Sequence, residues 1–130
     1  MMMKTMLATM CVGLLFAGVA WAGDKIVGKQ RDTIQAAMNK HIKDMLERNG
    51  NGKYPVFDPD LRTIVQLEFK KLHEGVEMMG EKTPYFVSCA DFVAEDDTKY
   101  DLDFFVSKKH GVVSTIVHAK NGVESRYDVH

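Results

Sequence analysis

The sequence contains few of the residues that cross-link or interrupt a chain. Its 130 residues include two cysteines, three prolines and one tryptophan. Cys11 lies in an N-terminal hydrophobic segment that we expect to be removed, which leaves Cys89 as the only thiol. Small exported domains often rely on disulfides, but a single cysteine cannot form one within its own chain. The folded domain must therefore be stable through its packing or through a partner subunit.

The sequence also lacks an excess of charge of either sign. Lysine and arginine together number 17 and aspartate and glutamate 18, which gives a formal net charge of −1. Proteins that bind nucleic acids or anionic membranes carry basic patches that attract phosphate groups. The composition therefore argues against nucleic acid as a partner, and we expect a small molecule or another protein instead.

A long hydrophobic run is found at the N-terminus. Lys4 precedes the apolar segment Met6–Val19, which ends in Ala20-Trp21-Ala22, the small-x-small pattern that signal peptidase cleaves. The apolar segment is short for a membrane-spanning helix, and a retained anchor is the alternative. We therefore predict a signal peptide over residues 1–22 and a single domain over residues 23–130. The expected location is periplasmic or secreted, with no membrane span after cleavage.

The first part of the predicted domain has the spacing of an amphipathic helix. Between Asp24 and Arg48, apolar residues recur at about every third or fourth position. The run Asn49–Gly52 follows, and its residues tolerate the positive φ angles that end helices. The pattern predicts one long N-terminal helix.

After this helix the pattern changes to that of strands. The predicted strands are Tyr85–Val93, Tyr100–Ser107, Val112–Ala119 and Val123–Val129. Short turns separate them, which favours an antiparallel meander. The segment Leu61–Val76 fits both a helical stripe and an alternating strand. We favour the strand, because a sheet of four or five strands would cover the helix better than three.

The expected fold class is α+β, with the long N-terminal helix packed on a curved antiparallel sheet of four to five strands. This order of elements resembles the cystatin-like and NTF2-like α+β rolls. The resemblance is architectural, since Thr63–Glu68 carries no glycine and the cystatin Gln-x-Val-x-Gly loop is absent. It implies a fold that hosts binding modules, dimers and a few enzymes, and it transfers no functional residues.

Polar side chains inside or beside the predicted strands are the first candidates for a site. They are His73, Cys89, Asp91, Asp101, Asp103 and His118. Neighbouring strands would bring them together, and aspartate is among the residues most depleted in strands. One interpretation is simply a solvated sheet face.

Two chemical interpretations of these residues stay open. Two histidines with aspartates suit zinc or a similar divalent ion, and the metal set would be His73, Asp91, Asp103 and His118. Alternatively, Cys89 could be a nucleophile beside His73 or His118, with Asp91 orienting the base. Mid-strand cysteines are commonly packed and inert, which weakens this catalytic interpretation.

The favoured function is a small, exported, non-catalytic binding or interaction module. Its cavity or interface would be lined by the aromatic residues Tyr85, Phe86, Tyr100 and Phe105. Sheet packing could also form a homodimer. The alternative is a small metal- or thiol-dependent enzyme that uses the His/Cys/Asp cluster. The sequence identifies no cofactor.

Overall fold

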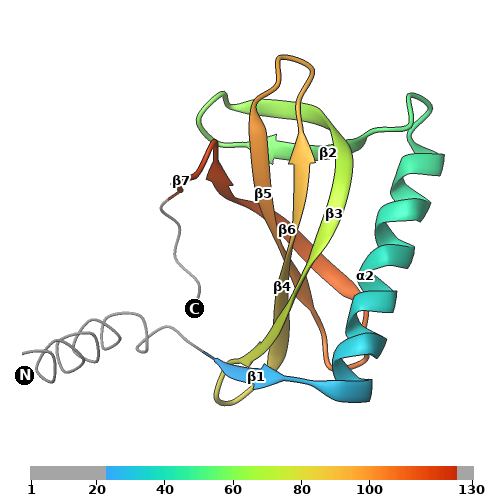
Figure 1. Cartoon of the computed structure of the whole chain (residues 1–130), viewed down its shortest axis with the longest axis vertical. Helices are drawn as coiled ribbons and strands as arrows, with labels where there is room; N and C mark the ends of the chain where they lie inside the picture. Colours follow the sequence, from blue (N-terminus) through green and yellow to red (C-terminus); the bar gives the residue numbers. More distant parts are fainter. Residues whose placement is uncertain (1–22, 126–130) are drawn as a thin grey trace, which may run out of the picture.

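The computed structural model describes residues 23–125, so the predicted signal peptide and residues 126–130 lie outside the described residues. The elements follow in the order β1 (Asp24–Ile26), α2 (Gly28–Arg48), β2 (Tyr54–Asp58), β3 (Thr63–Met79), β4 (Tyr85–Val93), β5 (Lys99–Val106), β6 (Val112–Lys120) and β7 (Val123–Glu124) (Figure 1). Among residues 23–125, no helix combines the length and the apolar character needed to cross a membrane.

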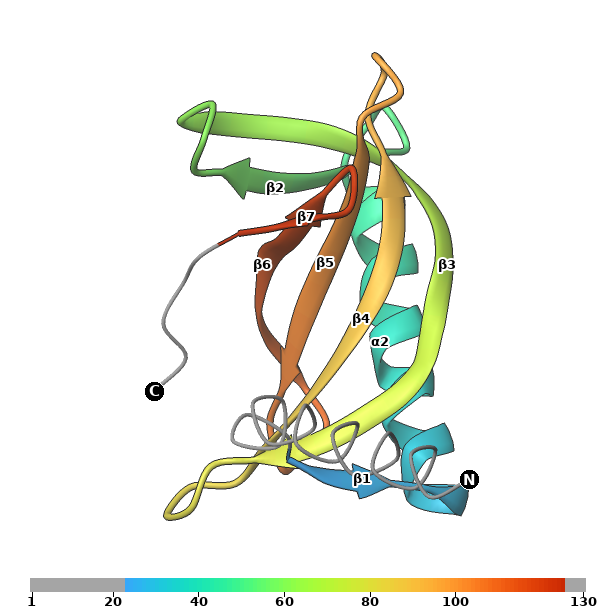
Figure 2. The same ribbon diagram turned by 60° about the vertical axis from the view of Figure 1, so that its left-hand side comes forward.

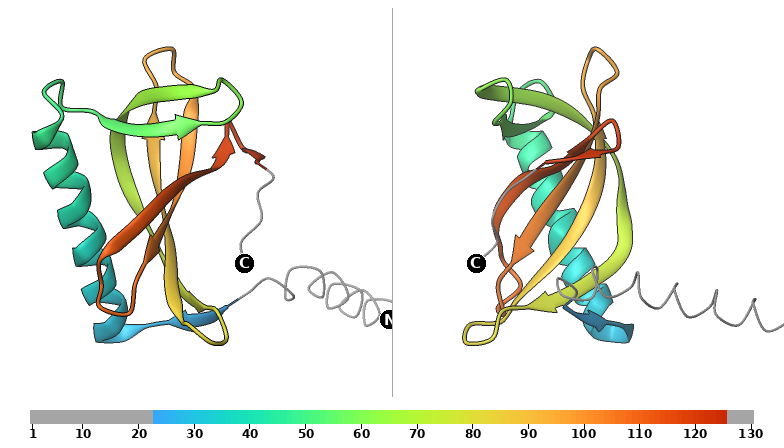
Figure 3. Two further views of the ribbon diagram at one scale, coloured as in Figure 1. Left: turned by 180° about the vertical axis from the view of Figure 1, so that it is seen from behind. Right: turned by 90° about the vertical axis from the view of Figure 1, so that its left-hand side faces the viewer.

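The strands form one strongly curled antiparallel sheet. Its order is β1-β3-β4-β5-β6-β7, and β2 pairs with the first part of β3. Strand β3 bends across the whole molecule (Figure 2), and its register with β4 shifts between Phe69 and Lys71 and again between Leu72 and Val76. Such bulges bend a strand and increase its twist. Because of this bend, β3 can pair with β2 at one end and with β1 at the other (Figure 3).

The core lies between α2 and one face of the sheet. The helix contributes the buried stripe Ile34, Met38 and Ile42. Alternate residues of the two central strands meet it, because side chains of a strand point to opposite faces in turn. These buried residues include Phe86, Ala90, Phe92, Leu102, Phe104 and Val106. We call the opposite face of strands β3 to β6 the outer face.

The predicted fold class, a long N-terminal helix on a sheet of four to five strands, is wrong. Strands account for 51% of the described residues, and the sheet contains seven of them. The helix is also shorter than predicted and is not the first element, since Asp24–Ile26 forms β1. The short strand β1 is stabilised by pairing with Val76–Met78. Because this partner is distant in sequence, the residues around Asp24–Ile26 show no strand pattern.

Individual strands agree better with their patterns. Strand β4 coincides with the predicted Tyr85–Val93. The segment Leu61–Val76 is strand over most of its length, so its helical alternative is wrong. Strand β7 starts at Val123 as predicted, and residues 126–129 of that prediction lie outside the described residues. Strand β2 was not predicted, and it contains Pro55, which is tolerated at a sheet edge.

A buried carboxylate fastens the β2–β3 turn to the rest of the sheet. Asp58, which is 0% exposed, ends β2. Its Oδ2 accepts hydrogen bonds from the hydroxyl of Tyr100 at 2.6 Å and from Nζ of Lys120 at 2.8 Å. Its Oδ1 accepts the backbone N–H of Asp60 at 2.9 Å. Strands β2, β5 and β6 are therefore joined through one side chain.

Candidate functional site

Four adjacent strands bring the polar candidates together on the outer face. His73 comes from β3, His118 from β6, and the remaining four from β4 and β5: Cys89, Asp91, Asp101 and Asp103. Cys89 pairs across the strands with Asp103, and Asp91 pairs with Asp101. Residues two apart in a strand share a face, so all four point to the same side. We call these six residues the outer-face cluster.

One half of the cluster is centred on His73. Its Nε2 lies 2.6 Å from Oδ1 of Asp91 and 4.0 Å from Oδ1 of Asp101. The Oδ1 atom of Asp101 is buried and has no hydrogen-bond partner within the described part of the chain. A buried carboxylate oxygen without a donor is unfavourable by about 1–3 kcal/mol. This atom therefore suits a cation or a donor supplied by a ligand.

The other half of the cluster is centred on Asp103. Its Oδ1 accepts a hydrogen bond from Sγ of Cys89 at 2.8 Å. Its Oδ2 lies 3.0 Å from Nδ1 of His118. The second ring nitrogen of His118, Nε2, lies 3.6 Å from Oε2 of Glu124. The carboxylate of Asp103 thus links the thiol to the second imidazole.

The electrostatics of the cluster are those of a site with surplus negative charge. Burial raises the pKa of Asp101, and the neighbouring Asp103 and Asp91 add to this rise against the attraction of the two histidines. Burial alone would lower the pKa of His118, but Asp103 and the other nearby carboxylates outweigh it, so this pKa is raised. Both shifts favour the protonated form, mainly because of burial at Asp101 and because of the neighbouring carboxylates at His118.

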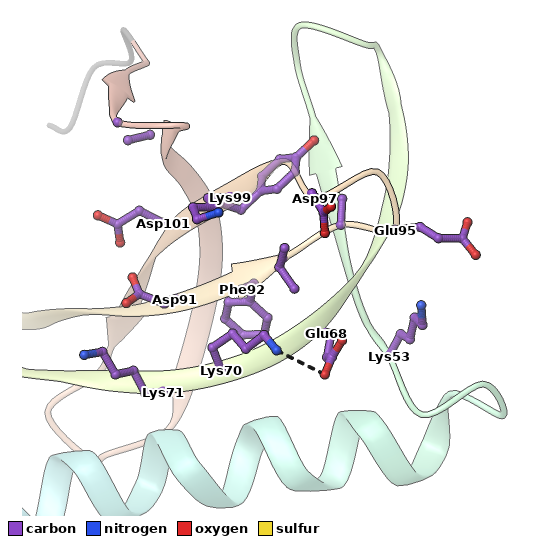
Figure 4. Close-up of a pocket in the computed structure, with 15 residues that line it drawn as sticks. Lys53, Glu68, Lys70, Lys71, Asp91, Phe92, Glu95, Asp97, Lys99 and Asp101 are labelled. Carbon is purple, nitrogen blue, oxygen red and sulfur yellow. Dashed lines mark hydrogen bonds and ion pairs between the residues drawn. The ribbon is translucent and has the colours of Figure 1, made fainter.

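Two hollows flank the cluster. A groove of about 360 Å³ runs over the outer face, and its lining includes His73, Glu77, Cys89, Asp103, Phe105 and His118. A larger groove of about 820 Å³ is lined by Asp91 and Asp101 together with lysines and other carboxylates. Figure 4 shows these two aspartates on neighbouring strands, with Lys71 on β3. The volume of the smaller groove is within the range of ligand sites. The cluster residues that line this groove are accessible to solvent through it.

Three members of the cluster are close enough to hold a metal ion. His73, Cys89 and Asp101 each offer one donor atom, and these atoms lie within 4.8 Å of one another. Ligands at about 2.0–2.3 Å from zinc in a tetrahedron are separated by about 3.5 Å. The three atoms would have to approach one another by up to about 1.3 Å to reach that separation. The Nε2 atom of His73 lies 4.0 Å from Oδ1 of Asp101 and also contacts Asp91 at 2.6 Å, so a metal bound through Nε2 would replace the contact with Asp91.

The residues proposed from the sequence as a metal set are divided between the two halves. His73 is paired with Asp91, whereas His118 is paired with Asp103. The donor atoms that converge come from His73, Cys89 and Asp101, of which Asp101 belonged to neither the metal set nor the catalytic set. Asp101 was among the polar residues predicted to come together, but the sequence assigned it to neither set.

The predicted catalytic set has an arrangement that opposes nucleophilic chemistry. The partner of the Cys89 thiol is the carboxylate of Asp103, and no hydrogen bond between this thiol and His73 or His118 occurs in the described chain. Burial strongly raises the pKa of Cys89, and the charge of Asp103 raises it further. Since the thiolate is the reactive form, these surroundings favour the neutral thiol over a nucleophilic thiolate in the absence of a metal.

Native Cys89 is expected to react with dithionitrobenzoate at least about a hundredfold more slowly than the urea-unfolded chain, because little thiolate is present. The measurement is the rate of absorbance change at constant pH, using protein without residues 1–22, in which Cys89 is the only cysteine. Free cysteine in the same urea solutions provides the control. Similar rates for native and unfolded protein would show an accessible thiolate.

The four aromatic residues predicted to line a cavity or interface lie on both faces of the sheet. Phe86 and Tyr100 are buried in the core. The rings of Tyr85 and Phe105 are stacked, with centroids 5.6 Å apart and an interplanar angle of 11°. Phe105 also lines the outer-face groove. This groove therefore combines polar side chains of the cluster with an apolar wall that includes Met79, Val87 and Phe105.

Comparison with known proteins found no family model, no curated protein and no solved structure that matches this chain. The resemblance to cystatin-like and NTF2-like proteins stays an expectation from the sequence.

Proposed function

We propose that this protein is an exported, non-catalytic binding module that holds a divalent transition-metal ion on the outer face of its sheet. The ligands are His73, Cys89 and Asp101. The observation that carries the proposal is the convergence of their three donor atoms within 4.8 Å. Three strands supply them, so the site depends on the sheet for its geometry.

The kinds of donor atom favour a particular class of metal. Imidazole and thiolate are ligands of zinc and related transition metals, whereas calcium and magnesium prefer oxygen ligands alone. A divalent ion would also give the buried Oδ1 of Asp101 a partner and offset the repulsion among Asp91, Asp101 and Asp103. Binding would replace the thiol proton of Cys89 with the metal, as zinc does in cysteine sites.

The wider surroundings support a binding role rather than catalysis. The carboxylate partners of His73 and His118 hold both imidazoles in place. The open groove would admit an ion from solvent. The leader-like segment 1–22 supports export.

Titration of chelator-treated protein with Zn²⁺ in a calorimeter tests the proposal. One ion per chain is expected to bind, and His73→Gln, Cys89→Ser and Asp101→Asn should each lower the affinity at least about tenfold, since each removes one ligand. Co²⁺ provides a spectroscopic probe, because a cobalt–thiolate charge-transfer band should appear in the parent protein and disappear in Cys89→Ser.

Matched controls separate ligand loss from general damage. His110→Gln in the turn between β5 and β6 and Asp32→Asn on α2 change the same residue types outside the cluster and its two grooves, and they should leave the affinity unchanged. Circular dichroism melts of every variant show whether it is folded. Absence of saturable Zn²⁺ binding by the folded parent protein would refute the proposal, as would equal losses in the control variants.

A further inference from the structure

The proposed metal site offers fewer ligands than a transition-metal ion takes. His73, Cys89 and Asp101 supply three donor atoms, and no fourth histidine, cysteine or carboxylate of residues 23–125 joins them within the mutual distance of 4.8 Å. Closed zinc sites have four protein ligands, whereas open sites have three and an exchangeable fourth ligand. An ion held here therefore has one coordination position for water or for a molecule from solution.

The smaller groove places apolar side chains beside the metal ligands. Two of the three ligands, His73 and Cys89, line this groove. Val87 and Phe105 also line it, and they are cross-strand partners. This pair lies two residues along β4 and β5 from Cys89 and its cross-strand partner Asp103. Side chains two residues apart share a face and are separated by about 6.6 Å along the strand. A molecule of two linked rings bound to the ion would therefore reach the apolar pair.

The apolar side of the groove is flat and held in place. The ring of Phe105 stacks on that of Tyr85, with an interplanar angle of 11°. Met79, the cross-strand partner of Tyr85, lines the same groove. A surface that is already ordered loses little conformational entropy on binding, and aromatic rings pack well against one another in offset or edge-to-face arrangements. The groove therefore favours a planar, apolar body.

The charges around the groove select against an anionic molecule. Glu77 and Asp103 line it, and none of the lysines or arginines of the described chain does, in contrast to the larger groove, which has four lysines (Figure 4). The thiolate of Cys89 and the carboxylate of Asp101 together balance the two positive charges of a divalent ion. An anionic fourth ligand would add a negative charge beside two carboxylates, which repel it. Neutral imidazole is a good ligand of such ions.

We propose that the metal ion binds, at its open coordination position, a small molecule that has a neutral aromatic nitrogen donor of the imidazole class and a planar apolar body packed on Val87 and Phe105. The nitrogen lone pair replaces a water on the ion, and no covalent bond of the molecule is broken. This inference rests on the proposed function, because the ion provides the bond to the donor nitrogen.

Titration of the Co²⁺-loaded protein with 4-phenylimidazole and with imidazole tests the inference, with the visible absorption bands of cobalt as the readout. Both compounds are expected to change the bands. 4-Phenylimidazole should bind at least about tenfold more tightly, because its second ring is removed from water against the apolar side of the groove. Benzoate, which carries the same ring on an anionic donor, should leave the bands unchanged at concentrations at which 4-phenylimidazole saturates them.

Substitutions in the groove separate contact with the apolar body from binding to the ion. Val87→Ala and Phe105→Ala should each reduce the preference for 4-phenylimidazole over imidazole at least about threefold, and the affinity for imidazole itself should be unchanged. The unchanged imidazole affinity also shows that each variant is folded. Val113→Ala is the matched control, since Val113 is 67% exposed on β6 and lines neither groove. It should keep the full preference.

The outcomes distinguish failure of this inference from failure of the proposed function. Absence of cobalt binding would overturn both. Cobalt binding with bands that neither imidazole changes would overturn the inference alone, because a protein group such as Asp91 or Asp103 would then complete the coordination. Equal affinities for the two compounds, or an equal loss of preference in Val113→Ala, would overturn the role of the apolar side of the groove. Saturation by benzoate would overturn the selection for a neutral donor.

Discussion

Truncation of Phe104 to alanine is expected to lower the free energy of unfolding by about 4 kcal/mol. Phe104 is 0% exposed and lies at the centre of the core. Its ring packs near those of Phe92, Tyr54 and His41, with centroid distances of 6.2, 5.8 and 6.1 Å. These neighbours come from β4, β2 and α2, so the cavity left by the ring would loosen three elements at once.

Urea unfolding followed by circular dichroism measures this loss. The neighbouring Phe105→Ala is the matched control, because Phe105 points to the outer face and is only partly buried. It should cost about 1–2 kcal/mol, mainly from its stack with Tyr85. Domains of this size are stable by about 5–15 kcal/mol, so the Phe104 variant should be folded but marginal. Equal losses for the two variants would contradict the assignment of the two faces.

Replacement of Asp58 by asparagine is expected to destabilise the protein by about 3 kcal/mol, because it leaves Lys120 and the Tyr100 hydroxyl without their buried carboxylate. The estimate lies at the lower end for buried pairs, since the side chain of Lys120 is 21% exposed. The matched control is Asp60→Asn. Its carboxylate contacts the same lysine at 3.5 Å from an exposed position, and its loss should cost less than about 1 kcal/mol.

The same interaction should depend on pH in a defined direction. Burial alone would raise the pKa of Asp58, but hydrogen bonds from Lys120, Tyr100 and two backbone N–H groups lower it below its ordinary value of 3.8. A lowered pKa in the folded state means that the ionised form is stabilised by folding. This contribution is therefore complete above the ordinary value and is lost as the pH falls through the folded pKa.

Urea titrations at several pH values measure this dependence. The difference in unfolding free energy between the parent protein and Asp58→Asn should be constant from about pH 7 down to pH 5 and shrink below about pH 4. The Asp60→Asn variant controls for general acid effects. A difference that grew on acidification would mean that folding raises the pKa of Asp58 instead of lowering it.

The strands that the sequence predicted well are those with a strong local pattern. Tyr85–Val93 and Tyr100–Ser107 are rich in aromatic and β-branched residues, and their observed limits agree within a residue. Asp24–Ile26 was predicted as helix, although it pairs with Val76–Met78. A strand of three residues is stabilised by its partner strand, which lies about fifty positions away along the chain. The spacing of nearby residues therefore does not predict it.

The members of the candidate site could be identified from the sequence because their residue types are uncommon in strands. Aspartate and histidine are unusual in apolar strands, which drew attention to Asp101, Asp103 and His118. Their grouping could not be identified in the same way. A slip of one residue in register moves every side chain to the opposite face, and register is decided by pairing between strands. The bulge between Leu72 and Val76 adjusts the position of His73 relative to β4.

By itself, the sequence determined where the central strands run, that a helix ends at Arg48, and which unusual polar residues deserve a chemical explanation. These properties depend on side-chain periodicity over a few neighbouring residues. The tertiary structure alone decided that residues 23–125 form a sheet of seven strands, that Cys89 bonds to Asp103, and that His73, Cys89 and Asp101 converge. Those features depend on which distant strands become neighbours and in which register, and the free energy of that choice comes from packing the whole core.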